Sequence, residues 1–370
     1  MVQPSRYRTR LNRKMFPSPE QAINVPVSAS SESSTSLPHL HQAPPLRTLV
    51  LLVGFPASTK STWAREYANE NKPHVEIVSR DIQGGKAVDL IPLVYQLLKA
   101  GKTVIVDNTN MTKDIRQPFI SIANDLNIPV HAVYFRTSIE DCQIRMLHRT
   151  WEKYGEIYLK GKAEKGAPAA KDPGVFPPAT LFAARKRLEE PQEEEGYASI
   201  QVHEVPAVSW NMRTYKNKAL FLDIDGTVRV SEGLPMKYPT KPSEVKLLHD
   251  DVGMKSVLDK YRNKGYMVIG ISNQSGIAKG TITETNVKAC MTRTQELLGL
   301  NQETFPITYC PHSPAPISCY CRKPQVGIAM QFIERYNLNP AKCIMVGDSK
   351  TDETMATRLG MTFIHTTTFW

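Results

Sequence analysis

Two acidic residues stand one position apart after a short hydrophobic run, within the sequence FLDIDGT at residues 221–227. Just past a buried strand, the carboxylates of Asp223 and Asp225 can diverge into separate environments. One can then attack a phosphorus atom while the other handles the proton of the leaving group. An isolated Asp-x-Asp could equally belong to a surface loop, so this interpretation depends on the residues that accompany it.

Three further groups of polar residues accompany the pair, each after a predicted strand. Ser272 begins the sequence SNQSG, whose hydroxyl and amide groups can hold phosphoryl oxygens. Lys323 lies in the sequence RKP and supplies a cation for the charge of a five-coordinate phosphorus. Asp348 lies in the sequence VGDSKTD, whose carboxylates suit Mg²⁺. Together the four groups predict magnesium-dependent phosphoryl transfer.

The order of these four motifs resembles that of the haloacid-dehalogenase-like superfamily. The resemblance implies that Asp223 is the nucleophile, which forms an aspartyl-phosphate, and that Asp225 is the acid/base. It also implies that Asp223, the Asp225 carbonyl and Asp348 hold Mg²⁺, while Ser272 and Lys323 bind phosphate. Little sequence separates Asp225 from the next predicted strand, so we expect a minimal cap.

Four potential metal ligands fall within twelve residues: Cys310, His312, Cys319 and Cys321. Sulfur and nitrogen ligands on either side of a short loop suit a closed tetrahedral Zn²⁺ site, so we expect a structural zinc ion. Disulfide bonding of these cysteines is the alternative, and both His312 and an intracellular setting argue against it. The other three of the six cysteines lie in apolar contexts and are predicted to be buried thiols.

This cysteine and histidine loop is similar to the zinc loop of the histidinol-phosphate and heptose-bisphosphate phosphatases, which also continues into Cys-Arg-Lys-Pro. Polynucleotide 3′-phosphatases share the four catalytic motifs but typically lack this zinc set. The second half therefore resembles both kinds of phosphatase. One resemblance implies a small phosphorylated metabolite as substrate, and the other implies a strand end.

A phosphate-binding loop is predicted by the sequence GFPASTKS at residues 54–61, which follows a hydrophobic strand and opens a helix. Backbone N–H groups of such a loop cradle triphosphate oxygens, Lys60 would reach the β and γ phosphates, and Ser61 would ligate Mg²⁺. Thr59 stands where the usual pattern has Gly, and a β-branched residue held at positive φ costs on the order of 1–3 kcal/mol. The alternative is a loop without nucleotide turnover. The predicted nucleotide contacts in the loop are Gly54, Ser58, Thr59, Lys60, Ser61 and Thr62.

Two acidic positions and two arginines extend this first site. Asp81 ends the second predicted strand and suits the base that accepts a proton from an attacking hydroxyl. Asp107, in the sequence DNTN, offers a second carboxylate for substrate or Mg²⁺. Arg145 and Arg149 are four residues apart on a predicted helix, so both can face the γ-phosphate and stabilise transition-state charge. A solvated basic face is the alternative for the arginine pair.

Residues 47–205 resemble the kinase domain of the polynucleotide 5′-hydroxyl kinases through these motifs and through the segment from Leu188-Glu189 to Glu195-Gly196-Tyr197. The family implies ATP and Mg²⁺, Asp81 as general base, and a lid that carries the arginines. Aromatic and lysine residues alternate between Trp151 and Lys171, as in a strand-binding lid, although an ordinary solvated insertion would look alike.

Short apolar runs alternate with helical patterns in both halves, which predicts two α/β domains with parallel sheets. The predicted strands are Leu49–Val53, Val75–Val78, Thr103–Val106, Val130–Phe135, Ala219–Leu222, Met267–Ile271, Ile307–Tyr309 and Ile344–Val346. We expect a basic, Ser- and Pro-rich disordered arm at 1–46, a P-loop domain at 47–206, a linker at 207–217 and a phosphatase domain at 218–370. Ligands of such sheets lie beyond the carboxyl ends of the strands, where the motifs fall.

Composition narrows the class of protein. The chain is 41% hydrophobic and 22% charged, as in globular proteins, and has no apolar run near the roughly 18 residues of a membrane span. Its net charge of +10 favours a polyanionic partner such as nucleic acid. The basic arm could contact nucleic acid, direct nuclear import or act as a mitochondrial transit peptide. We expect an intracellular protein, with the nucleus favoured over the mitochondrion or cytoplasm.

Three functional hypotheses follow. The first is a bifunctional end-healing enzyme of nucleic-acid repair, which phosphorylates 5′-hydroxyl ends with ATP and removes 3′-phosphates from DNA or RNA. The second is a pair of metabolic enzymes acting on sugar or amino-alcohol phosphates. The third treats the first domain as a degenerate nucleotide- or strand-binding module, because of Thr59. The basic charge, the fusion and the kinase resemblance favour the first.

Overall fold

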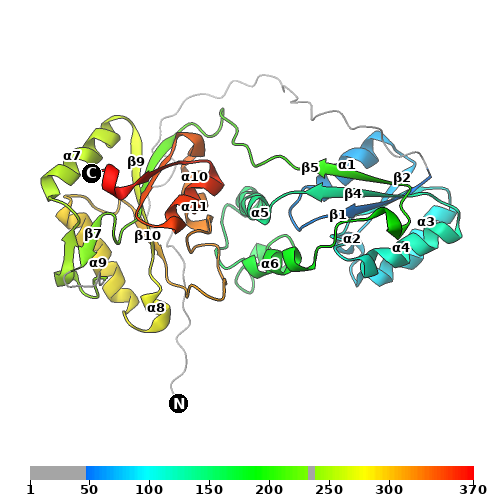
Figure 1. Ribbon diagram of the computed structural model, residues 1–370, viewed down its shortest axis with the longest axis horizontal. Coiled ribbons are helices and arrows are strands. Elements are labelled where there is room, and N and C mark those ends of the chain that lie inside the picture. The colour runs from blue at the N-terminus through cyan, green and yellow to red at the C-terminus, as the bar shows by residue number, and fades with distance from the viewer. Residues whose placement is uncertain (1–46, 232–237) are drawn as a thin grey trace, which may run out of the picture.

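The computed structural model describes residues 47–231 and 238–370, and the predicted arm at 1–46 lies outside this range. Two α/β units follow one another along the chain and lie side by side along the long axis of the molecule (Figure 1). Each contains a parallel sheet of five strands with helices packed against it. The predicted fold class is thus confirmed.

The first sheet has the strand order β2-β3-β1-β4-β5, and all its pairings are parallel. Its central strand β1 is completely buried, as expected for a hydrophobic strand covered on both faces. The strands are β1 (Leu49–Val53), β2 (Val75–Val78), β3 (Thr103–Val106), β4 (Val130–Arg136) and β5 (Ser199–Glu204). The α-helices are α1 (Lys60–Glu70), α2 (Arg80–Gln83), α3 (Ile91–Lys99), α4 (Lys113–Asp125), α5 (Ile139–Tyr154) and α6 (Pro178–Arg187).

The second sheet has the order β10-β9-β6-β11-β12 and is also parallel throughout. Its strands are β6 (Lys218–Leu222), β9 (Tyr266–Asn273), β10 (Ile307–Cys310), β11 (Ile344–Gly347) and β12 (Thr362–His365). Its α-helices are α7 (Asp251–Asn263), α8 (Gly276–Lys279), α9 (Glu284–Leu297), α10 (Gly327–Tyr336) and α11 (Lys350–Leu359). A small antiparallel ribbon, β7 (Arg229–Ser231) with β8 (Val245–Leu247), lies between β6 and α7 in the chain, in agreement with the minimal cap.

All eight predicted strands are present. β1, β2 and β3 have the predicted bounds, β4, β6, β10 and β11 are one residue longer at one end, and β9 is one residue longer at its start and two at its end. The edge strands β5 and β12 were not predicted from the sequence, because their residues are exposed or half-exposed and lack a continuous apolar run. Helix α3 is preceded by a 3₁₀ turn at Ala87–Leu90, and Pro92 stands in its first turn.

The two units share a buried junction in which α5 packs against α10. His148 of α5 contacts Glu334 of α10, with 2.8 Å between Nδ1 and Oε1. Tyr215 donates to the other oxygen of Glu334 at 2.6 Å and is itself buried. At the edge of the junction Arg358 approaches Glu140 at 3.4 Å. Within the part of the chain that the structure describes, every helix is too short or too polar to cross a membrane.

Candidate active sites

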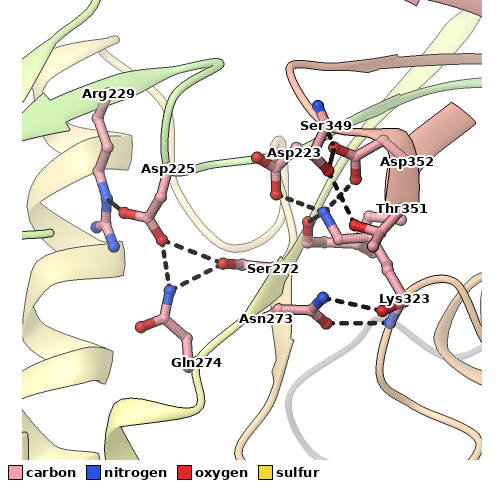
Figure 2. A network of polar contacts seen from close by, with 11 residues as sticks. Asp223, Asp225, Arg229, Ser272, Asn273, Gln274, Lys323, Ser349, Thr351 and Asp352 are labelled. Atoms are coloured by element: carbon pink, nitrogen blue, oxygen red, sulfur yellow. Dashed lines mark hydrogen bonds and ion pairs between the residues drawn. The ribbon is translucent and has the colours of Figure 1, made fainter. Parts of the chain in front are cut away.

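Asp223 lies at the carboxyl end of β6, only 7% exposed, and is ion-paired to the ammonium group of Lys323 (Figure 2). The same ammonium lies 2.6 Å from a carboxylate oxygen of Asp352 and donates to the Ile271 carbonyl at 3.0 Å. Lys323 is held in turn by Asn273, which exchanges two hydrogen bonds with its main chain at 3.0 and 3.1 Å. A fixed cation therefore faces the predicted nucleophile.

Asp348 completes a group of three carboxylates with Asp223 and Asp352, whose oxygen atoms lie within 4.8 Å of one another. Hard oxygen ligands at this spacing suit Mg²⁺. Gly226 permits the close approach, because a Cβ atom there would lie 2.1 Å from Oδ2 of Asp348. Asp352 is fully buried and accepts a hydrogen bond from the Ser349 hydroxyl at 2.6 Å. It was not among the predicted site residues, although it ends the VGDSKTD motif.

The ionisation of these groups follows from burial and neighbouring charge. Burial raises the pKa of Asp223 and outweighs the opposing effect of Lys323. Burial alone would lower the pKa of Lys323, but Asp223 and Asp352 overcome it and raise that pKa. Burial, with Asp352 nearby, also raises the pKa of Asp348. A bound divalent cation would favour the ionised form of both aspartates.

The side chain of Asp225 points away from Asp223, toward a separate set of partners (Figure 2). Arg229 donates from Nε to its Oδ1 at 2.8 Å, and the Gln274 amide donates to its Oδ2. Ser272, predicted to bind phosphate, donates to the same Oδ2 at 3.2 Å. The carboxylate of Asp225 lies outside the three-carboxylate group, so only its carbonyl is left for the metal role that the resemblance implies. Arg229 was not predicted as a site residue. Gln274 belongs to the SNQSG motif, whose amide groups were predicted to hold phosphoryl oxygens, and here its amide holds Asp225.

Cys310, His312, Cys319 and Cys321 come together at the end of β10, with one donor atom of each within 4.8 Å of the others. None of the three cysteines forms a disulfide. Sulfur atoms at the corners of a tetrahedron around zinc would be about 3.8 Å apart for bonds of about 2.3 Å. The Cys310 sulfur lies 3.7 Å from that of Cys319 and 3.2 Å from that of Cys321. The cluster therefore fits a closed zinc site, and its protein ligands fill all four positions.

The predicted phosphate loop connects β1 to α1, with Thr59 at φ 67° and ψ 4°. The expected positive φ at Thr59 is therefore present, and Ala57 shares it at φ 62°. The ammonium of Lys60 is folded into the loop, where the Phe55 carbonyl accepts at 2.6 Å and Ser58 Oγ at 3.1 Å. Burial lowers the pKa of Lys60 to about 8, although nearby carboxylates oppose it. Ser61 and Thr62 follow in the first turn of α1.

Asp107 lies at the end of β3, beside the loop, where burial raises its pKa against a hydrogen bond from Ser61. Asp107 and Asp81 are both close enough to Lys60 to influence its pKa. Asp81 is exposed in α2, which Ser79 caps by accepting from Ile82. The predicted base, the lysine and a second carboxylate thus lie along the same, carboxyl edge of the sheet.

Arg145 and Arg149 both belong to α5, as predicted, and each guanidinium donates to a main-chain carbonyl. Arg145 donates to Pro206 and, at 3.2 Å, to the Thr137 hydroxyl. Arg149 donates to the Gly174 carbonyl at 2.8 Å. Gly174 belongs to the segment 155–177 between α5 and α6, part of the predicted lid. The hydrogen bonds of both arginines among the described residues thus go to the neighbouring loops, and none goes to the phosphate loop.

Comparison with known proteins agrees with this geometry. Residues 49–157 match a family model described as "AAA domain", and residues 218–369 match one described as "Polynucleotide kinase 3 phosphatase". A probable D-glycero-D-manno-heptose-1,7-bisphosphate 7-phosphatase of Thermoplasma volcanium is 34% identical over 40% of this chain and 96% of its own length. The D-glycero-beta-D-manno-heptose-1,7-bisphosphate 7-phosphatase of Haemophilus ducreyi is 31% identical over 39% of this chain and 79% of its own length.

Solved structures show weaker likeness. The D,D-heptose 1,7-bisphosphate phosphatase of B. bronchiseptica, solved with magnesium and phosphate, is 26% identical with a TM-score of 0.34, over 40% of this chain and 78% of that one. A chain of the Pnkp1/Rnl/Hen1 RNA repair complex is 16% identical with a TM-score of 0.26, over 88% of this chain and 97% of that one. The assignment therefore depends on the family matches and on the identities to curated phosphatases. Through residues 218–369 the chain belongs to the polynucleotide kinase 3 phosphatase family of haloacid-dehalogenase-like phosphatases, and a P-loop kinase domain precedes that domain.

Proposed function

We propose that this chain heals nucleic-acid ends, with an ATP-dependent 5′-hydroxyl polynucleotide kinase at 47–206 and a magnesium-dependent polynucleotide 3′-phosphatase at 218–370. The observation that carries the proposal is the fusion itself: a P-loop domain precedes a domain of the polynucleotide kinase 3 phosphatase family. The net charge of +10 favours a polyanionic substrate. Together the two reactions would give a broken strand the ends that sealing requires.

In the proposed phosphatase reaction, a carboxylate oxygen of Asp223 attacks the phosphorus of the terminal 3′-phosphate. The bond to the 3′-oxygen breaks, and Asp225 gives its proton to that oxygen as the alcohol leaves. Asp225, now ionised, takes a proton from water, which attacks the aspartyl-phosphate and releases inorganic phosphate and free Asp223. Separate partners keep the roles distinct: Lys323 faces Asp223, and Arg229 and Gln274 hold Asp225.

Positive charge supports this reaction from the side of Asp223. Lys323 would neutralise part of the charge on the transferring phosphoryl group, and its position is fixed by Asn273. Mg²⁺, when held by Asp223 and Asp348, would neutralise more of that charge. Asp352 holds Lys323 in place through its ion pair, and it would hold Lys323 in this way whether or not it also contacts Mg²⁺.

In the proposed kinase reaction, Asp81 accepts the proton of the 5′-hydroxyl as its oxygen attacks the γ-phosphorus of ATP. The bond from the γ-phosphorus to the bridging oxygen breaks, and ADP leaves. Lys60 would swing from the loop carbonyls to the β and γ phosphates, and Arg145 would leave the Pro206 carbonyl to face the developing charge. Arg149, whose Nη2 is held by the Gly174 carbonyl, would face that charge with its other N–H groups. Ser61 and Asp107 would hold Mg²⁺ beside the triphosphate.

A small phosphorylated metabolite is the second candidate substrate of the phosphatase half. Two observations favour it: identities of 31–34% to curated proteins named as heptose-bisphosphate phosphatases, and the cysteine and histidine cluster that we propose binds structural zinc. Both candidates use the same chemistry at Asp223 and Asp225. They differ in the part of the substrate that must be accommodated beside the phosphate, which is a nucleic-acid strand in one case and a small metabolite in the other.

The deciding experiment measures phosphate release by the full chain from 3′-phosphorylated oligodeoxynucleotides and oligoribonucleotides, from a heptose bisphosphate and from histidinol phosphate. We expect kcat/KM for an oligonucleotide to exceed that for either metabolite by at least about 100-fold, equivalent to about 2.7 kcal/mol of transition-state discrimination. Turnover of the metabolites alone would refute end healing. Transfer of labelled γ-phosphate from ATP to a 5′-hydroxyl strand tests the kinase half in the same preparation.

Two variants serve as each other's control. Asp223→Asn should abolish phosphate release and leave 5′ phosphorylation intact, whereas Lys60→Ala should do the reverse. Because the two residues lie in different units, loss of both activities in either variant would point to misfolding. Thermal unfolding of each variant would reveal that case.

A further inference from the structure

Tyr320 lies between two of the predicted zinc ligands in the phosphatase half, and its buried side chain contacts the kinase half of the molecule. The residue has no exposed surface. Its amide donates to the Leu159 carbonyl at 2.6 Å, and its hydroxyl donates to the Phe176 carbonyl at 3.0 Å. Leu159 and Phe176 both belong to the segment 155–177, which connects α5 to α6 in the P-loop domain. One side chain of the metal loop thus joins two separated points of the kinase half.

The segment 155–177 forms one closed unit around this contact. Gly161 packs so tightly on the returning chain that a Cβ atom would lie 2.1 Å from the Phe176 carbonyl oxygen. Asp172 accepts hydrogen bonds from the Tyr154 hydroxyl at 2.6 Å and from the amide of Gly174 at 2.7 Å. These contacts tie the segment to the last turn of α5, so a shift at one point is transmitted to the others.

Arg149 is the residue of α5 that this segment holds. Its guanidinium donates to the Gly174 carbonyl, two residues before Phe176, at 2.8 Å. A continuous chain of contacts therefore runs from the metal loop through Tyr320 and Phe176 to Arg149. Figure 1 shows the loop after β10 approaching the connection between α5 and α6.

On the phosphatase side, Tyr320 has little freedom to move. Cys319 and Cys321, its neighbours in the chain, belong to the metal-ligand group. The Tyr320 carbonyl accepts from the amide of Gly327 at 2.8 Å, and a Cβ atom on Gly327 would lie 2.8 Å from the Cβ of Tyr320. A metal ion that fixes both cysteines would fix the backbone of Tyr320 as well.

We infer that the zinc site acts on both halves: through Tyr320 it positions the segment 155–177 of the kinase half, and with it Arg149. Tyr320 is a positioning residue in this scheme, because it touches neither nucleotide nor strand. The part that concerns Arg149 rests on the proposed kinase function. The part that concerns the segment rests on the contacts alone.

Hydrogen–deuterium exchange of the full chain tests the inference. We compare the zinc-loaded protein, the chelated protein and zinc-loaded Tyr320→Ala, and follow peptides within 158–177. Amides that report on the segment include those of Gly161 and Val175, which donate to backbone carbonyls at 2.7 and 3.0 Å. We expect exchange in 158–177 to be at least about tenfold faster after chelation and in Tyr320→Ala, while β1 stays protected, and added zinc to reverse the chelated case.

Two further variants keep the test decisive. Ile317→Ala alters the same loop at a side chain that is 41% exposed, and it should retain zinc and leave exchange in 158–177 unchanged. Tyr320→Phe removes only the hydroxyl, and about two- to tenfold faster exchange near Phe176 is expected with zinc retained. If Tyr320→Ala loses zinc or fails to fold, Tyr320→Phe decides in its place. Unchanged exchange in 158–177, after chelation or in the deciding variant, overturns the inference.

Kinetics separate this inference from the proposed function. In Tyr320→Phe we expect a several-fold loss of kcat/KM for ATP in 5′ phosphorylation, with hydrolysis of p-nitrophenyl phosphate unchanged. A wild-type chain without kinase activity would contradict the proposed function and leave the exchange result to decide about Tyr320. A segment that loosens without any change in an active kinase would overturn the role assigned to Arg149.

Discussion

Arg229 lies four residues after Asp225, and its Nε donates to Oδ1 of that aspartate at 2.8 Å. The arginine side chain is 1% exposed and its Nη1 also donates to the Thr294 hydroxyl of α9 at 3.0 Å. The proposed acid/base is therefore held by a buried cation whose own position depends on a helix of the same unit. Asp225 is fixed on the side opposite Asp223.

Arg229→Gln should reduce kcat of the phosphatase by about 10- to 100-fold, because a mispositioned acid/base loses part of the factor of about 10² to 10⁴ that such a group supplies. KM should change by less than about threefold, since Arg229 is not expected to touch the substrate. Arg229→Lys should recover part of kcat. Steady-state kinetics, with Tm measured alongside, check the prediction.

The matched control is Arg262→Gln, which removes a partly exposed arginine paired with Asp259 at 3.4 Å. Its kcat should equal that of the wild type. If Arg229→Gln kept full kcat at unchanged Tm, Asp225 would not depend on Arg229.

Gly226→Ala should remove magnesium-dependent phosphatase activity by more than about 100-fold, because the new methyl group would lie 2.1 Å from Oδ2 of Asp348 and displace it. Gly280→Ala is a stringent control: Gly280 has φ 70° against 91° for Gly226, but no atom lies within 4 Å of its added Cβ. Equal losses in both variants would mean that backbone strain, and not displacement of Asp348, causes the effect. Phosphate release at varied Mg²⁺ distinguishes the two.

Much of the fold and the position of both sites could be predicted because the information is local. Hydrophobic runs such as residues 49–53 mark buried parallel strands, and the polar residues that follow them must lie at one edge of the sheet. Asp223 directly follows β6 and obeys this rule. Lys323 lies 13 residues after the end of β10 and was placed by its motif, yet the two residues, 100 positions apart in the chain, are ion-paired.

The residues that the sequence did not reveal are those whose roles depend on distant partners. Arg116 looks like an ordinary helix residue, but it is fully buried and donates to Glu195 at 2.6 and 2.8 Å and to the Asn110 and Glu189 carbonyls. Its contacts explain why the segment 188–197 accompanies the nucleotide site. No spacing rule indicates such a pair, just as none indicated that Tyr320 contacts the other half.

Thr59→Gly tests whether the backbone strain at Thr59 lowers the stability of the folded protein or weakens the binding of ATP. Thr59 has φ 67° in this structure, and we expect this conformation to be the same with and without nucleotide, so that the strain belongs to the folded protein itself. Relief of about 1–2 kcal/mol, offset by about 0.5–1 kcal/mol of glycine flexibility, predicts a net gain in stability of between about 0 and about 1.5 kcal/mol. KM for ATP should stay within about twofold of the wild type.

Asn127→Gly provides the comparison, because Asn127 has φ 51° outside the nucleotide site. Chemical denaturation and ATP kinetics are measured on both variants. A tenfold fall in KM in Thr59→Gly alone would show that the loop abandons this conformation when nucleotide is absent.

His148, at the junction of the two halves, should make stability depend on pH. Its hydrogen bond with Glu334 raises the pKa of the imidazole above the ordinary value of 6.5, against the effect of burial. A pKa that is higher in the folded state means that folding takes up protons. The stabilisation is therefore complete below about pH 6.5 and is lost as pH rises through the raised pKa of the folded state.

The difference in Tm between the wild type and His148→Gln should accordingly be largest near pH 6 and shrink toward pH 8.5. His249→Gln, at an exposed position outside the junction, is the matched control for replacing a histidine by glutamine. A difference that grew with pH would mean that His148 contributes to the junction as a neutral side chain, through its ring contact with Trp210.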